Sequence, residues 1–116
     1  MKKNEFVEKN LFGVCPFFTT QQLFLGKWLF PILNELSTGA KRFGQLQKQF
    51  GITRTTLSQQ LKTLENEGLV HREVFPEVPP HVEYSLTELG KSFQPVLDSI
   101  EIWGNEYIKF LKSRKI

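Results

Sequence analysis

A proline-rich interruption between two strand-like segments constrains most strongly what this chain can fold into. The stretch FPEVPPHVEYSLT, residues 75–87, contains three prolines: Pro76, Pro79 and Pro80. Proline fixes the backbone angle φ and removes an amide donor, so none of the three can lie within a central strand. Residues 69–75 and 81–87 carry strand-forming side chains, and apolar and polar residues alternate in the second segment. The sequence therefore predicts a β-hairpin with a long, stiff tip.

Helical periodicity accounts for most of the remaining chain. Apolar spacing and cap residues predict helices at about residues 17–25, 27–37, 43–50 and 54–67, and a long helix at 88–115 after the hairpin. This order is that of a winged helix-turn-helix domain, in which the hairpin is the wing and its stiff tip can lie along a phosphate backbone. We therefore predict a mainly α fold with a small β-hairpin wing, in one domain spanning residues 1–116.

Single residues predict where these helices begin, turn and end. Gly51 can adopt the left-handed geometry of a tight turn, and Thr53 can cap the helix that follows. We expect Thr19 or Thr20 to cap the first helix and Thr87 to cap the last. Proline beyond the first turn of a helix forfeits a backbone hydrogen bond. The second helix should therefore start late or kink at Pro31, and Pro95 and Gly104 should bend or segment the last helix.

Charge is unevenly distributed along the chain. The net charge is only +3, but no acidic residue lies between Glu35 and Glu65, and that window holds five basic residues: Lys41, Arg42, Lys48, Arg54 and Lys62. Such a window is typical of a surface that meets polyanions, although an ordinary solvated face explains the charge alone equally well.

The helix after Gly51 has a polar face suited to reading DNA. Leu57, Leu61 and Leu64 form its apolar stripe, which leaves the opposite face with Arg54, Thr55, Ser58, Gln59 and Lys62. Arginine pairs with guanine and glutamine with adenine through two hydrogen bonds each, and acidic residues that would repel phosphate are absent. Residues expected to contact phosphate add to this face. The predicted DNA-binding residues are together Lys41, Arg42, Thr53, Arg54, Thr55, Ser58, Gln59, Lys62 and His81. His81 could equally be a solvated loop histidine.

The sequence lacks the patterns that catalysis or metal binding requires. It has no glycine-rich phosphate loop, no HExxH motif and no paired-cysteine spacing, and His71 and His81 alone do not make a metal site. We expect no enzyme activity, no metal and no cofactor. The longest apolar run, residues 28–33, is too short to cross a bilayer, and no signal-peptide pattern follows the N-terminus. With a single cysteine, these features predict a cytoplasmic protein without membrane contact.

The last helix carries more apolar surface than a small winged-helix core can cover. Surplus surface of this kind usually marks an interface, so we predict a homodimer. The residues assigned to that interface are Phe93, Leu97, Ile100, Trp103, Tyr107, Ile108 and Leu111.

The runs CPF, LGKW, KRFGQL, LSQQLKTLENEGLVHR and FPEVPPHVEYSLTELG resemble the HxlR family of bacterial winged-helix transcription regulators, relatives of the MarR group. The resemblance covers residues 15–103. It implies a homodimer that binds palindromic operators in double-stranded DNA, with a DNA-binding core at about residues 17–90. It also implies that about residues 1–25 and 91–116 pair the subunits. Pro31 and His81 depart from the family pattern, and no small-molecule effector is indicated.

Cys15 has two interpretations. Some members of the family use a cysteine at the matching position to sense oxidants or electrophiles, so the resemblance makes Cys15 a candidate redox sensor. The chemistry requires a thiolate, which a helix N-terminus favours. Alternatively, Cys15 is a small apolar filler beside Phe17 and Phe18. The function of the whole chain also has an alternative interpretation, a winged-helix module that binds protein instead of DNA. Such a module should lack the acid-free basic window of this chain.

Overall fold

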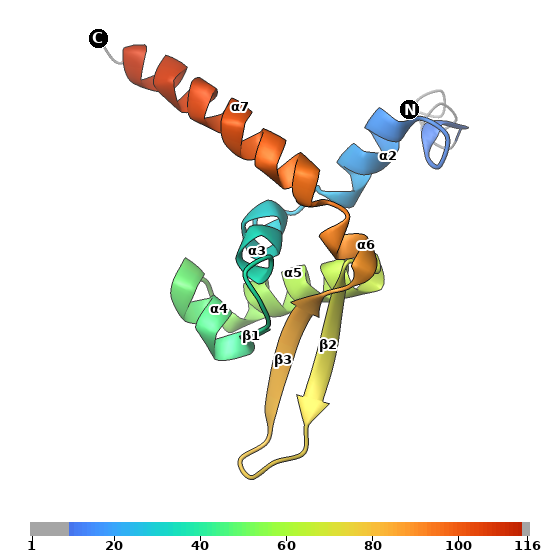
Figure 1. Cartoon of the computed structure of the whole chain (residues 1–116), viewed down its shortest axis with the longest axis vertical. Coiled ribbons are helices and arrows are strands. Elements are labelled where there is room, and N and C mark those ends of the chain that lie inside the picture. Colours follow the sequence, from blue (N-terminus) through green and yellow to red (C-terminus); the bar gives the residue numbers. More distant parts are fainter. Residues whose placement is uncertain (1–9, 115–116) are drawn as a thin grey trace.

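The computed structural model describes residues 10–114 and has the predicted order of elements. Figure 1 shows a helical body with a long hairpin below it and two helices above it. The elements are α2 (Pro16–Leu23), α3 (Leu29–Leu36), β1 (Lys41–Arg42), α4 (Phe43–Phe50), α5 (Arg54–Asn66), β2 (Val70–Phe75), β3 (His81–Leu86), α6 (Glu88–Lys91) and α7 (Gln94–Ser113). The fold is a winged helix-turn-helix, mainly α with a small sheet, as predicted.

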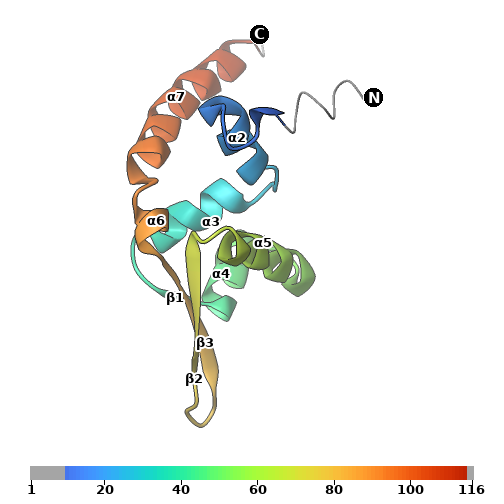
Figure 2. The ribbon, with the colours of Figure 1, turned by 90° about the vertical axis from the view of Figure 1, so that its right-hand side faces the viewer.

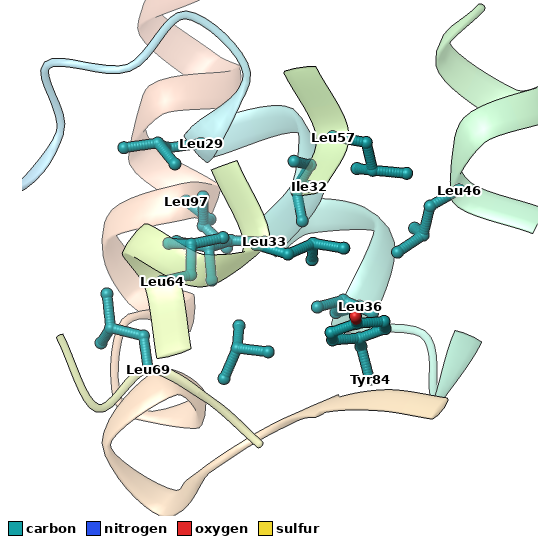
Figure 3. Close-up of a cluster of buried hydrophobic side chains, with 12 residues drawn as sticks. Leu29, Ile32, Leu33, Leu36, Leu46, Leu57, Leu64, Leu69, Tyr84 and Leu97 are labelled. Atoms are coloured by element: carbon teal, nitrogen blue, oxygen red, sulfur yellow. The ribbon is translucent and has the colours of Figure 1, made fainter. Parts of the chain in front are cut away.

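The core lies between α3, α5 and the base of the hairpin. The three leucines predicted to form the buried stripe of α5, Leu57, Leu61 and Leu64, are each at most 1 % exposed. Figure 3 shows side chains of α3, α4, α5, the sheet and α7 meeting in one cluster. Its members are Leu29, Ile32, Leu33, Leu36, Leu46, Leu57, Leu61, Leu64, Leu69, Val70, Tyr84 and Leu97. This packing fixes α5 against the hairpin, and so fixes the polar face of α5 relative to the wing.

The hairpin is confirmed, and the structure adds a strand that the sequence does not reveal. β2 and β3 are antiparallel, and all three prolines lie between them, outside the ladder. The sheet order is β1-β3-β2, with Lys41 opposite Tyr84 and Arg42 opposite Glu83. A strand of two residues is too short to show a periodic pattern in the sequence. β1 is recognised only because it pairs with β3.

The turn and cap residues predicted around α5 are confirmed. Gly51 has φ 62°, in the left-handed region, and the Thr53 Oγ1 accepts a hydrogen bond from the Thr56 amide at 3.1 Å. Thr87 also acts as a cap, because its Oγ1 accepts from the Gly90 amide at 3.0 Å. Pro31 is the third residue of α3, where no amide donor is needed, so the predicted late start is confirmed.

Two boundary predictions are wrong. The first helix is capped by Cys15, whose Sγ accepts from the Phe18 amide at 3.5 Å, and not by a threonine. Pro16 then occupies the first helical position, which proline favours. The predicted last helix is segmented near Pro95 into α6 and α7, but Gly104 lies inside an uninterrupted α7. One glycine costs a helix only about 1 kcal/mol, which is too little to break 20 residues of helix.

The terminal helices leave the body at the end opposite the tip of the hairpin (Figures 1 and 2). The radius of gyration is 17.0 Å, whereas a compact domain of this length has about 13 Å. The excess arises because α2 buries no residue and α7 buries only Leu97. Among the described residues, no helix is long and apolar enough to span a membrane.

Candidate nucleic-acid interface

The outer face of α5 is polar, exposed and free of acidic side chains up to Glu65. The six residues predicted on and just before this face are all exposed in the structure: Thr53, Arg54, Thr55, Ser58, Gln59 and Lys62. The helix begins at Arg54, so its first-turn amides and the hydroxyls of Thr53 and Thr55 lie at the same end. Free amides and small hydroxyl groups at a helix N-terminus suit close approach to a phosphate.

Gln60 fixes the position of this helix, a role that the sequence analysis missed. Its Oε1 accepts a hydrogen bond from the Trp28 amide at 3.3 Å, which links α5 to the start of α3. Gly26 leaves room for this contact, because a Cβ at residue 26 would collide with the Gln60 Oε1. The run LGKW therefore supplies both the glycine and the amide that hold α5. The sequence contains this run, but it does not show that Trp28 pairs with Gln60, which lies 32 positions later. Only the fold reveals that hydrogen bond.

Arg54 rests on an aromatic ring from the preceding helix. Its Cζ lies 5.1 Å from the centre of the Phe43 ring. Among the described residues no carboxylate forms an ion pair with it. Its hydrogen-bonding donors therefore remain available to an incoming ligand.

The predicted phosphate contacts differ in how accessible they are. Arg42 and Lys48 are exposed. Lys41 is half-buried, and its Nζ lies 3.9 Å from a carboxylate oxygen of Glu35. This pair holds β1 against the end of α3, so contact between Lys41 and a phosphate would compete with Glu35. Arg42 also shapes the start of α4, because its amide donates to the Gln45 Oε1 at 2.8 Å.

A shallow hollow of about 510 Å³ separates α4 and the start of α5 from the wing. It brings together Arg42, Arg54 and His81, which lie far apart in the sequence. The lining residues are Arg42, Phe43, Gly44, Gln45, Gln47, Arg54, Pro80, His81 and Val82. The start of α5 and the base of the wing tip therefore border the same hollow.

His81 makes contacts within the wing. Its Nδ1 lies 3.4 Å from a carboxylate oxygen of Glu77, and its Nε2 lies 3.1 Å from one of Glu83. Its ring stacks on Phe75 with centroids 4.8 Å apart, and the side chain is only 13 % exposed. His81 is therefore not the solvated loop residue of the alternative interpretation. Its contact with a phosphate stays a prediction, and such a contact would compete with Glu77 and Glu83. The ring of His81 lies between two carboxylates at the base of the wing tip.

The wing itself carries little positive charge. Between residues 70 and 86 Arg72 is the sole basic residue apart from two histidines, against Glu73, Glu77 and Glu83. The positive charge of this surface therefore lies on β1, α4 and α5 and not on the hairpin.

A second surface, on the terminal helices, is apolar. Trp103 is 66 % exposed and Ile108 is 47 % exposed, as a predicted interface requires. Two residues assigned to that interface lie instead in or against the core. Leu97 is 6 % exposed, and Phe93 stacks on Phe24 with centroids 4.9 Å apart. Further exposed apolar residues lie on or near these helices and were not predicted from the sequence, namely Phe12, Val14, Phe17, Leu25, Ile102 and Phe110.

Comparisons with known proteins agree with this geometry. Residues 23–112 match the HxlR-like helix-turn-helix family. The chain is 44% identical over 97 residues to the uncharacterized HTH-type transcriptional regulator YdeP of Bacillus subtilis (strain 168), covering 83% of this chain and 76% of that protein.

Solved structures give the same result. The redox regulator HypR in its oxidized form superposes with a TM-score of 0.73 at 40% identity, covering 79% of this chain and 96% of that one. The reduced form of the transcriptional regulator YodB from B. subtilis has a TM-score of 0.71 at 32% identity, covering 81% and 95%. The family consists of transcriptional regulators and not of enzymes. This chain belongs to the HxlR-like helix-turn-helix family of transcriptional regulators.

Proposed function

We propose that this regulator is not an enzyme and acts as a homodimer on palindromic operators in double-stranded DNA, reading base sequence through the outer face of α5. The observation that carries the proposal is an exposed helix face with arginine, glutamine and small hydroxyl residues and without an acidic residue before Glu65. Gln60 and the leucine stripe connect that helix to the core and to α3, and base recognition benefits from such support.

Within this face we assign distinct roles. Arg54 and Gln59 are proposed to contact base edges in the major groove, where arginine reads guanine and glutamine reads adenine. Thr53, Thr55, Ser58, Lys62, Arg42 and Lys48 are proposed to position the helix through phosphate contacts, with Lys41 at the edge of the contact surface. The wing is proposed to follow the backbone, and a phosphate contact from His81 would compete with Glu77 and Glu83.

Two-fold pairing of the chain through α2 and α7 would present two reader helices together. Both helices lie at the end of the molecule opposite the wing tip, and both carry exposed apolar side chains. In a dimer of this kind the reader helices contact half-sites about one helical turn of DNA apart, or a multiple of it, so the operator repeats the symmetry of the protein.

The test is selection of bound sequences from random DNA with the purified protein. Enrichment of an inverted repeat, with half-site centres about 10 bp apart or a multiple of that, is expected. If no sequence is enriched, although the protein is folded, the proposal is wrong. The alternative of a winged-helix module that binds protein would then be favoured.

We further propose that oxidation of Cys15 regulates operator binding. Cys15 is half-buried at the N-cap of α2, on one of the two helices proposed to pair the subunits. HypR, to which this chain is similar, is described as a redox regulator, and YodB has also been solved after treatment with diamide. Diamide oxidises two thiols to one disulfide and is itself reduced to a hydrazine. It would therefore join Cys15 of one subunit to Cys15 of the other, or to a small thiol, and either product would alter the pairing of α2 and the spacing of the reader helices.

Operator binding before and after diamide, in the wild type and in Cys15→Ser, tests this regulation. The wild type should lose or gain affinity, while the variant should be unaffected. Unchanged wild-type affinity after the thiol has demonstrably reacted would show that Cys15 is a structural residue.

A further inference from the structure

Phe43, the first residue of α4, supports the guanidinium of Arg54, the first residue of α5. The ring of Phe43 is half-buried and lies 6.4 Å, between centroids, from the ring of Tyr84. Tyr84 in turn is 7 % exposed and belongs to the core. An exposed arginine on the DNA-facing surface therefore rests on a ring that the core holds in place.

Among the described residues, the guanidinium of Arg54 has an aromatic contact, with Phe43, and no hydrogen-bond partner. It lies at the hollow that is also lined by Arg42, Pro80 and His81. In the part of the chain that the structure describes, Arg54 forms no ion pair. Contact with an aromatic ring consumes none of the five N–H donors of a guanidinium. Arg54 is thus restrained while the donors that would pair with guanine stay free.

We propose that Phe43 is a positioning residue for base recognition, which holds Arg54 at the mouth of the hollow between α4 and the wing, oriented toward the major groove. The proposal rests on the reading of DNA by α5. A flexible arginine loses side-chain entropy when it binds a base, and a restrained one loses less. Phe43 therefore increases discrimination at the base pair that Arg54 contacts, without touching a base itself.

The first test measures binding to the selected operator and its single-base variants. Arg54→Ala identifies the base pair that Arg54 reads. Phe43→Leu should reduce discrimination at that same base pair by roughly two- to fivefold, the range of a cation–π contact at an exposed site. Phe43→Tyr keeps the ring and should retain wild-type discrimination. In the Arg54→Ala background, Phe43→Leu should cause no further change in discrimination.

Each result separates this proposal from the reader assignment. Wild-type discrimination in Phe43→Leu, or an equal loss of discrimination with and without Arg54, overturns the positioning role but leaves Arg54 as a reader. If Arg54→Ala alters no base preference, the reader assignment fails and the role of Phe43 fails with it.

A second test uses the free protein and needs no DNA. Protons over the face of an aromatic ring are shielded, so the NMR resonances of the Arg54 side chain should move downfield in Phe43→Leu and stay in place in Phe43→Tyr. Arg114 is the control, because its Cζ lies 5.5 Å from the ring of Phe110 on α7, a contact in which Phe43 takes no part. Arg54 resonances that do not move in Phe43→Leu, in a protein that remains folded, overturn the proposal.

Discussion

At the scale of single residues, we propose that the side chains on the DNA-facing surface divide into those that read bases and those that contact phosphates. Arg54 and Gln59 are exposed on α5, whereas Arg42 is exposed at the start of α4, beside the hollow. Base contacts determine specificity and phosphate contacts determine affinity and register. Substitutions at the two kinds of site should therefore differ in what they change, and not only in how much.

Arg54→Ala and Gln59→Ala should each weaken binding to the selected operator by about 1–3 kcal/mol and relax preference at one base pair. Arg42→Ala should weaken binding to all sequences alike and reduce the slope of log K against log salt by about one. Titrations of operator and unrelated DNA at several salt concentrations measure both effects. An Arg54→Ala protein with wild-type affinity and preference would exclude Arg54 as a reader.

The packing around Gly90 leaves no room for a larger side chain. Gly90 is buried in α6, and a Cβ there would collide with the backbone carbonyl oxygen of Leu69. Because a backbone atom cannot rotate away, Gly90→Ala should lower the free energy of unfolding by roughly 1–3 kcal/mol or more. Gly44→Ala is the matched control, since no atom lies near a Cβ at that position. Urea denaturation compares the two, and equal stabilities would refute the close approach.

At the scale of elements, the position of the reader helix depends on one side-chain contact beside its leucine stripe. Gln59 and Gln60 are adjacent and chemically identical, but Gln59 faces solvent and Gln60 accepts a hydrogen bond from the Trp28 amide. Their neighbours, and not their own chemistry, give them different functions.

Gln60→Ala should lower the free energy of unfolding by about 1–3 kcal/mol, because it leaves the part-buried Trp28 amide without its acceptor. Gln59→Ala should change stability by less than about 0.5 kcal/mol, as is usual for a surface substitution. Denaturation of both variants, with the operator affinities measured in parallel, tests this division. The idea fails if both variants are equally stable.

At the scale of the whole molecule, the terminal helices α2 and α7 bury little of their apolar surface against the rest of the chain. α7 has 20 residues but buries only Leu97, and it projects away from the body in Figures 1 and 2. Trp103 and Tyr107 stack with centroids 5.4 Å apart on this exposed surface. Contiguous aromatic surface of this kind is stabilised when a partner covers it.

Trp103→Glu combined with Ile108→Glu should convert the proposed dimer to monomers, because it places charges where apolar surface would be buried. Sedimentation equilibrium should give twice the chain mass of 13.5 kDa for the wild type and the single mass for the variant. Val78→Glu is the control, since Val78 is 99 % exposed at the wing tip, far from these helices. A monomeric wild type at micromolar concentration would contradict the dimer.

Local chemistry in the sequence determined most of the fold. The prolines of the tip, the spacing of Leu57, Leu61 and Leu64, and the turn at Gly51 each act on neighbours within a few residues, so the pattern alone predicts the hairpin and the reader helix. The exposed face of α5 followed directly, because a helix that buries one stripe must expose the opposite one.

Only the tertiary structure decided which of these residues act together. β1 exists because β3 pairs with it, Gln60 anchors α5 because Trp28 lies beside it, and Phe43 supports Arg54 because the turn folds α4 against α5. The burial of Leu97 and the carboxylate contacts of His81 also depend on elements packed against them. These contacts join residues distant in the sequence, and periodicity, which reports only on near neighbours, cannot encode them.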